Sequence, residues 1–80
     1  MDAYAYRTFL HQKNNDNGSE EVWYTVELVY EEDGISHRRE QGPTGETLED
    51  LIGDIAMMLE AVTKPALPID RWQEQLKKET

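Results

Sequence analysis

The sequence predicts an α+β domain in which a three-stranded antiparallel sheet packs on one amphipathic helix and a short C-terminal helix follows, in the order β-β-β-α-α. Three observations support this fold class. Residues 21–31 alternate between apolar and polar side chains, residues 48–62 carry apolar side chains at helical spacing, and Asp33-Gly34 separates two extended segments as a hairpin turn would. Because 80 residues leave room for one core, residues 1–80 are expected to form a single domain.

The predicted sheet has three strands that follow one another along the chain. The first covers residues 3–12, and either of its faces could be buried. Its two faces carry Tyr4, Tyr6 and Leu10 on one side and Ala3, Ala5 and Phe9 on the other. In the second strand, residues 21–31, the even-numbered side chains from Val22 to Tyr30 are expected to face the helix. The third strand, residues 35–41, is very polar and is therefore placed at a sheet edge.

Two helices are predicted from their capping residues and apolar periodicity. Thr47, with Asp50 three residues later, is typical of a helix N-cap, and Pro65 ends this first helix. Its apolar stripe, which we expect to cover the sheet, consists of Leu48, Leu51, Ile52, Ile55, Leu59 and Val62. Residues 65–69 are expected to be extended. Asp70, with Gln73, is the predicted N-cap of a short helix that ends near residue 78.

Charge and cysteine content restrict the partners. Seventeen acidic and eight basic residues give a net charge of -9, which disfavours direct binding of nucleic acid and suits a basic protein partner. The absence of cysteine excludes disulfides, Cys-ligated zinc and thiol catalysis. No apolar run is long enough to span a membrane and the N-terminus lacks the features of a signal peptide, so a cytoplasmic protein without membrane association is expected.

The sequence contains no pattern that predicts a catalytic, cofactor-binding or metal site. Ser36 and His37 are neighbours on a predicted strand, so their side chains point to opposite faces and do not form part of a triad. The two histidines have no metal-ligand spacing, and residues 15–20 lack the full set of ligands of a calcium loop. We therefore expect a protein that is not an enzyme and binds no cofactor.

Two charged clusters are candidate binding sites. Glu46, Asp50 and Asp54 recur at intervals of four and predict an acidic helix face that could dock a basic protein by imitating nucleic-acid phosphates; the alternative is a solvated helix face. His37-Arg38-Arg39 could contact an acidic partner or RNA. The alternative is that they pair across the strands with Glu27 and Glu31 of the second strand.

Three apolar side chains depart from the pattern. Trp23 and Val29 lie on the polar side of the second strand, and Met57 lies opposite the apolar stripe of the first helix. One interpretation is a contact surface for a partner protein or for a second copy of the chain, which would make a homodimer. The other is that Leu67, Ile69 and Trp72 fold back and cover Trp23 and Val29.

The segment Gly45-Glu46-Thr47-Leu48-Glu49-Asp50, which follows a hairpin and opens an apolar helix, resembles the HicB-like antitoxin domain. The similarity spans about residues 22–70 and includes the tail Lys64-Pro65-Ala66-Leu67-Pro68. This resemblance implies a β-β-β-α arrangement, homo-oligomerisation and neutralisation of a small RNA-cleaving toxin.

Three functional hypotheses follow from the sequence. The first is a non-enzymatic interaction module, antitoxin-like or inhibitor-like, that binds a partner protein. The second is an acidic, phosphate-mimicking inhibitor of the phage type, directed at a nucleic-acid-binding protein. The third is a small enzyme or ligand-binding domain, which would need a deep pocket with perturbed carboxylates.

Overall fold

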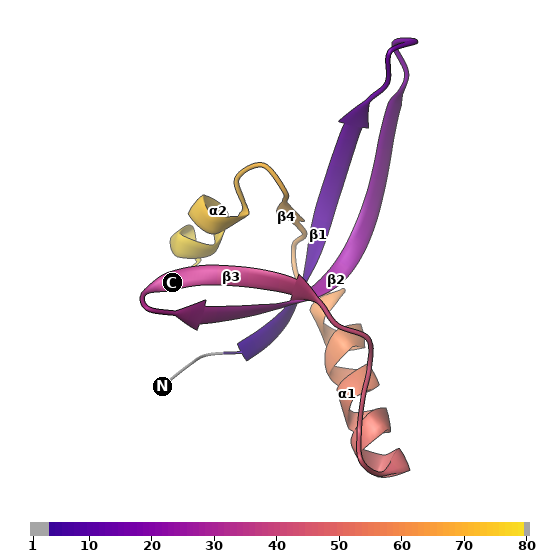
Figure 1. The fold of residues 1–80 in the computed structure, drawn as a ribbon, viewed down its shortest axis with the longest axis vertical. Coiled ribbons are helices and arrows are strands. Elements are labelled where there is room, and N and C mark those ends of the chain that lie inside the picture. The colour runs from indigo at the N-terminus through magenta and orange to yellow at the C-terminus, as the bar shows by residue number, and fades with distance from the viewer. Residues whose placement is uncertain (1–3, 80) are drawn as a thin grey trace.

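A computed structural model describes residues 4–79 and has six elements along the chain (Figure 1). These are β1 (Tyr4–Asn14), β2 (Glu20–Glu32), β3 (Ile35–Glu40), α1 (Leu48–Ala61), β4 (Leu67–Pro68) and α2 (Trp72–Lys78). The α+β class and both helices agree with the expectation from sequence. Residue Ala3 of the predicted first strand lies outside the described residues.

The sheet has four strands in the order β3-β2-β1-β4, and not three. The first three strands pair antiparallel, whereas β4 pairs parallel with β1 through Phe9 opposite Leu67 and Leu10 opposite Pro68. The Ile69 amide continues this pairing by donating to the Leu10 carbonyl at 3.0 Å. The sequence predicts only an extended segment here, because a strand of two residues, one of them Pro68, is too short to show an alternating pattern.

Two turns set the register of the antiparallel strands. Asp33 (φ 55°) and Gly34 (φ 78°) both have positive φ, as a two-residue hairpin turn of the primed type requires. At the other end of β2, Gly18 has a φ of 85° and closes the loop to β1. The β3 strand lies at the edge of the sheet, as its polarity predicts.

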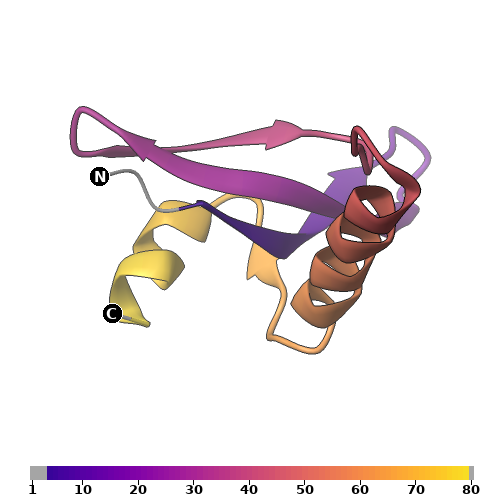
Figure 2. The same cartoon turned by 90° about the horizontal axis from the view of Figure 1, so that it is seen from below.

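The two helices pack on opposite faces of the sheet. Tyr6 and Leu28 pack with Ala61 of α1 on one face. Phe9 and Val29 pack with Leu67 on the other face, where α2 covers them. Both faces of β1 are therefore buried, which explains why its sequence has no single apolar side. Figure 2 shows the two helices well separated from each other, at opposite ends of the sheet in that view.

The α2 helix is fastened by an aromatic contact and an ion pair. Trp72 meets Phe9 edge to face, with ring centroids 5.6 Å apart. Arg7, which is buried in β1, donates to both carboxylate oxygens of Glu79 at 2.7 and 3.0 Å and to the Pro65 carbonyl at 3.1 Å. This hydrogen bonding lowers the pKa of the Glu79 carboxyl below its ordinary value. The C-terminal end of α2 is thus tied to the centre of the sheet.

The capping residues agree with the sequence for one helix and differ for the other. Thr47 caps α1, and its side chain accepts a hydrogen bond from the Asp50 amide at 3.1 Å. The predicted cap of α2 was wrong: Arg71, and not Asp70, occupies the N-cap position, without a side-chain cap bond in the described chain. The reason is that the Arg71 amide donates to the Pro68 carbonyl, a turn that delays the helix by one residue.

Gly45 is required by the close approach of the connector to the first turn of α1. A Cβ at this position would lie 2.7–2.8 Å from the Asp50 carbonyl carbon and Cβ and still closer to the Leu51 amide nitrogen. Gly53 is a matched control, because a Cβ there would meet nothing within 4 Å.

We expect Gly45→Ala to lower the free energy of unfolding by about 1–3 kcal/mol, because the backbone must shift to relieve the overlap. Gly53→Ala should raise it by about 0.5–1 kcal/mol, because alanine loses less backbone freedom on helix formation than glycine does. Urea unfolding of both variants measures the difference. Equal effects of the two substitutions would contradict the close approach.

Candidate functional site

The outer side of α1 carries five exposed apolar side chains. These side chains, which we call the outer stripe, are Leu48 (72% exposed), Ile52 (58%), Ile55 (46%), Leu59 (69%) and Val62 (56%). The expectation that they cover the sheet was therefore wrong. Of the predicted stripe, only Leu51 is half-buried.

The side of α1 that faces the sheet is different and partly polar. Ala61 is 2% exposed and packs directly on Tyr6 and Leu28, with Met58 beside them. The Tyr6 hydroxyl donates to the Asp54 carboxylate at 2.8 Å. Burial and this hydrogen bond raise the pKa of the Tyr6 phenol above its ordinary value of 10.0, so it remains a donor at neutral pH. These contacts rotate the outer stripe away from the sheet.

Leaving the outer stripe in water is costly. Full burial of one Leu, Ile or Val side chain contributes about 1.5–3 kcal/mol, so five side chains that are 46–72% exposed leave on the order of 6 kcal/mol unrealised. That amount is comparable with the whole net stability of a small domain, about 5–15 kcal/mol. An apolar surface of this kind is typical of a protein contact.

A groove next to Val62 continues the apolar surface onto the sheet. It has a volume of about 440 Å³. Its lining comes from the strands β1 and β2 and from the segment that follows α1, through Thr8, Tyr24, Thr25, Val26, Val62, Lys64 and Ala66. Tyr24 is 63% exposed. The outer stripe and this groove therefore form one continuous candidate contact surface.

The predicted contact residues Trp23 and Val29 have different environments. Val29 is 7% exposed and belongs to the core with Phe9 and Leu67, so it is not available for contacts. Trp23 is 43% exposed on β2, opposite His11 of β1, and the two rings stack with centroids 5.1 Å apart. The alternative interpretation, coverage by the C-terminal segment, thus holds for Val29 and not for Trp23.

The predicted acidic face does not form as three equivalent carboxylates. Asp54 is half-buried and accepts from the Tyr6 hydroxyl and, at 2.9 Å, from the Thr44 amide. Glu46 precedes α1, which begins at residue 48, and only Asp50 is an exposed acid of the helix among the three. Met57 is 55% exposed on α1, outside the outer stripe.

The basic cluster of β3 is mostly engaged within the sheet. Arg38 donates to Glu27 at 2.6 Å, which is the cross-strand pairing expected as the alternative to partner binding. His37 stacks on Tyr30, with ring centroids 5.4 Å apart, and the Arg39 guanidinium lies 5.7 Å from the same ring.

Glu27 was expected only as a cross-strand partner of the basic cluster, and its burial was not predicted, because it occupies the polar side of β2. It is 1% exposed and accepts hydrogen bonds from Arg38 and from the Thr25 hydroxyl, both at 2.6 Å. Since Thr25 uses its only proton for Glu27, the contact of 2.8 Å to His11 requires that Nε2 of His11 donates. Burial acts to raise the pKa of the Glu27 carboxyl, but these hydrogen bonds outweigh it and lower the pKa.

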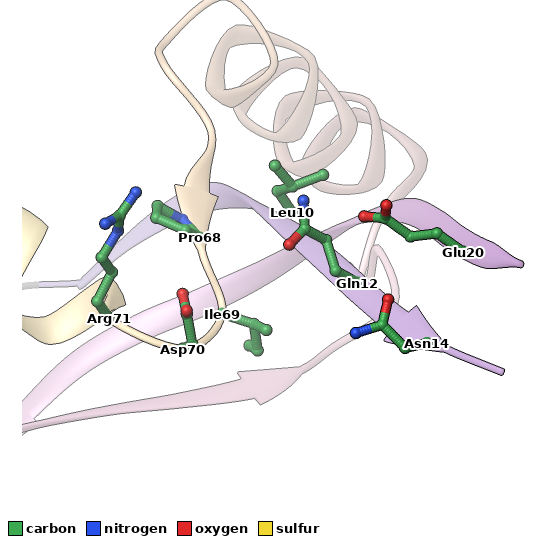
Figure 3. A pocket seen from close by; sticks show the side chains of 8 residues that line it. All are labelled: Leu10, Gln12, Asn14, Glu20, Pro68, Ile69, Asp70 and Arg71. Carbon is green, nitrogen blue, oxygen red and sulfur yellow. The ribbon is translucent and has the colours of Figure 1, made fainter. Parts of the chain in front are cut away.

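A second, polar cleft lies between the hairpin and the segment after β4 (Figure 3). Its volume is about 510 Å³, and Gln12, Asn14 and Glu20 face Asp70 and Arg71 across it. Among residues 4–79 no three His, Asp or Glu side chains gather in an arrangement that could hold a metal ion. In the same part of the chain, neither helix has the length and apolar character needed to cross a bilayer.

Removal of the partner of Glu27 should be strongly destabilising. We expect Arg38→Met to lower the free energy of unfolding by about 3 kcal/mol, because it leaves a buried carboxylate without its counter-ion. The matched control is Arg39→Met, an exposed neighbour whose loss should cost less than about 1 kcal/mol. Chemical denaturation at pH 7 measures both. Similar losses for the two arginines would contradict the assigned role of Glu27.

The lowered pKa values of Glu27 and Glu79 predict a stability that falls in acid. Each carboxyl has an ordinary pKa of 4.5 and a lower one in the folded state, so its contribution is complete above pH 4.5 and is lost as the pH falls through the lowered value. Unfolding free energies measured from neutral pH downwards should therefore decline below about pH 5. In Glu79→Gln this decline should be shallower, and an unchanged slope would contradict the assignment of Glu79.

The chain matches no protein-family model, no curated protein and no solved structure. The contact surface formed by the outer stripe and the groove is therefore the feature that bears on its function.

Proposed function

We propose that this chain is a non-enzymatic protein–protein interaction module, antitoxin-like or inhibitor-like in kind, that binds its partner through the outer stripe of α1 and the groove beside Val62. One observation carries the proposal: a complete apolar helix face is 46–72% exposed while α1 contacts its own sheet through other residues. An exposed apolar face of this kind is typical of a surface that a partner protein covers.

The signal for this surface is present in the sequence. The outer stripe recurs at intervals of four, three, four and three residues, which is the spacing of a helix that packs against another element along one seam. The acids of α1 lie elsewhere: Glu49, Asp50, Asp54 and Glu60 all fall roughly 100° or more from the centre of the stripe, at 3.6 residues per turn. Apolar contact, and not charge, therefore characterises the surface.

The other two hypotheses have less support. A phosphate-mimicking face would need several free carboxylates, but Asp54 is held by Tyr6 and Thr44. A ligand-binding role would use the polar cleft of Figure 3, whose lining includes no buried acid like Glu27. An interaction module is favoured because its surface is apolar and is therefore costly to leave exposed.

A tagged chain incubated with lysate of the native host tests the proposal. We expect wild type to retain a specific protein, a further copy of the chain included, and Leu59→Glu to lose it, because the new carboxylate would be buried in the contact. Met57→Glu is the matched control, since Met57 is also exposed on α1, by 55% against 69% for Leu59, but lies outside the outer stripe. Mass spectrometry identifies the retained proteins.

Equal retention by wild type and Leu59→Glu would contradict the assigned surface. For a protein that passes this comparison, affinity should not fall as salt is raised, because the contact is apolar. A steep loss of affinity with salt would instead favour the acidic, phosphate-mimicking alternative.

A further inference from the structure

We infer that the occupant of the outer stripe is a second copy of this chain, whose α1 packs antiparallel on the first; this inference rests on the proposed function and names its partner. The two stripes would form an isologous contact about a two-fold axis close to Ile55. The outer stripe suits a two-fold contact, because the spacing of its residues is nearly the same from either end of the helix. Relative to Ile55 its members lie at -7, -3, +4 and +7.

The charges at the two ends of α1 favour the antiparallel arrangement. The N-terminal end carries Glu46 and Glu49, and Lys64 follows the C-terminal end. An antiparallel pair places Glu46 of each copy close to Lys64 of the other and opposes the two helix dipoles. A parallel pair would instead bring the acidic N-termini together.

The groove beside Val62 supplies area that one helix face lacks. A specific dimer buries roughly 800 Å² per copy, which four turns of α1 do not provide alone. In the antiparallel pair Leu48, the most exposed member of the outer stripe, lies opposite Val62 and thus at the groove lined by Tyr24 and Val26. By symmetry, Leu48 of each copy enters the groove of the other copy.

The net charge of -9 opposes association of two copies, so the placement of the acids matters. Because the acids of α1 lie outside the outer stripe, the contact itself buries no like charges. Repulsion between the remaining charges is long-range and is screened by salt. We therefore expect dimerisation to strengthen as salt is raised, the opposite of what an electrostatic partner would show.

Sedimentation equilibrium on the purified chain, at concentrations up to the order of 100 μM, tests the dimer. We expect twice the chain mass for wild type and for Met57→Glu, and at least a tenfold weaker association for Leu59→Glu. Circular dichroism of each variant confirms that it is folded. A monomeric wild type at every salt concentration, or a dimer that Leu59→Glu leaves intact, would overturn the inference.

Crosslinking tests the orientation without relying on a disruptive variant. The chain has no cysteine, so Leu48→Cys and Val62→Cys each introduce a unique thiol. With a short bifunctional maleimide we expect a crosslinked dimer when the two variants are mixed. Leu48→Cys alone should give none, because in the antiparallel pair its two copies lie roughly 21 Å apart at 1.5 Å per residue. Crosslinking of Leu48→Cys with itself, or failure of the mixture, would overturn the antiparallel pair.

The oligomeric state and the capture experiment together distinguish the interaction module from the dimer. If the chain is monomeric but Leu59→Glu still abolishes capture of another protein, the proposed function stands and the second copy is excluded. If the chain is monomeric and Leu59→Glu changes nothing, both are excluded.

Discussion

The orientation of α1 depends on one polar contact to the sheet. The Tyr6 hydroxyl donates to Asp54 at 2.8 Å, and Ala61 is small enough to let the end of α1 lie directly on Tyr6 and Leu28. An aspartate cannot satisfy this hydrogen bond unless the side of α1 that carries it turns toward the sheet. The outer stripe is then turned away from the sheet. Its exposure, on which the proposed contact surface depends, follows from this rotation of α1.

Much of the fold could be predicted because it is governed by local chemistry. The Asp33-Gly34 turn and the Thr47 cap each depend on residues that are close in sequence, and each is present in the structure. The alternation of residues 21–31 predicted the strand β2, but the expectation that the even-numbered side chains from Val22 to Tyr30 face the helix was wrong in part. Val22 and Tyr24 are exposed, and Glu27, Leu28 and Val29 are buried in succession, because both faces of β2 are covered at that point. The four-stranded sheet could not be predicted in the same way. Its last strand has two residues, and only pairing with β1, far away in the sequence, defines them as a strand.

The candidate surface was recognisable as apolar but was assigned to the wrong neighbour. The 3–4 spacing of the outer stripe is visible in the sequence, yet periodicity alone does not say whether a stripe faces its own sheet or another protein. That choice depends on Tyr6 and Asp54, which are 48 residues apart. The burial of Glu27 was missed for a related reason: two of its partners, Arg38 and His11, lie on the neighbouring strands β3 and β1. Of the two apolar residues singled out on the polar side of β2, Trp23 is exposed and Val29 is buried, since the C-terminal segment covers only Val29.

The rotation of α1 can be measured in solution from the nuclear Overhauser contacts of the Tyr6 ring. With isotope filtering to select contacts within one copy, the ring should show contacts to the methyl groups of Met58 and Ala61 and none to those of Ile52 or Leu59. Contacts from Tyr6 or Leu28 to Ile52 and Leu59 within the same copy would show that the outer stripe covers its own sheet, and would contradict the rotation of α1.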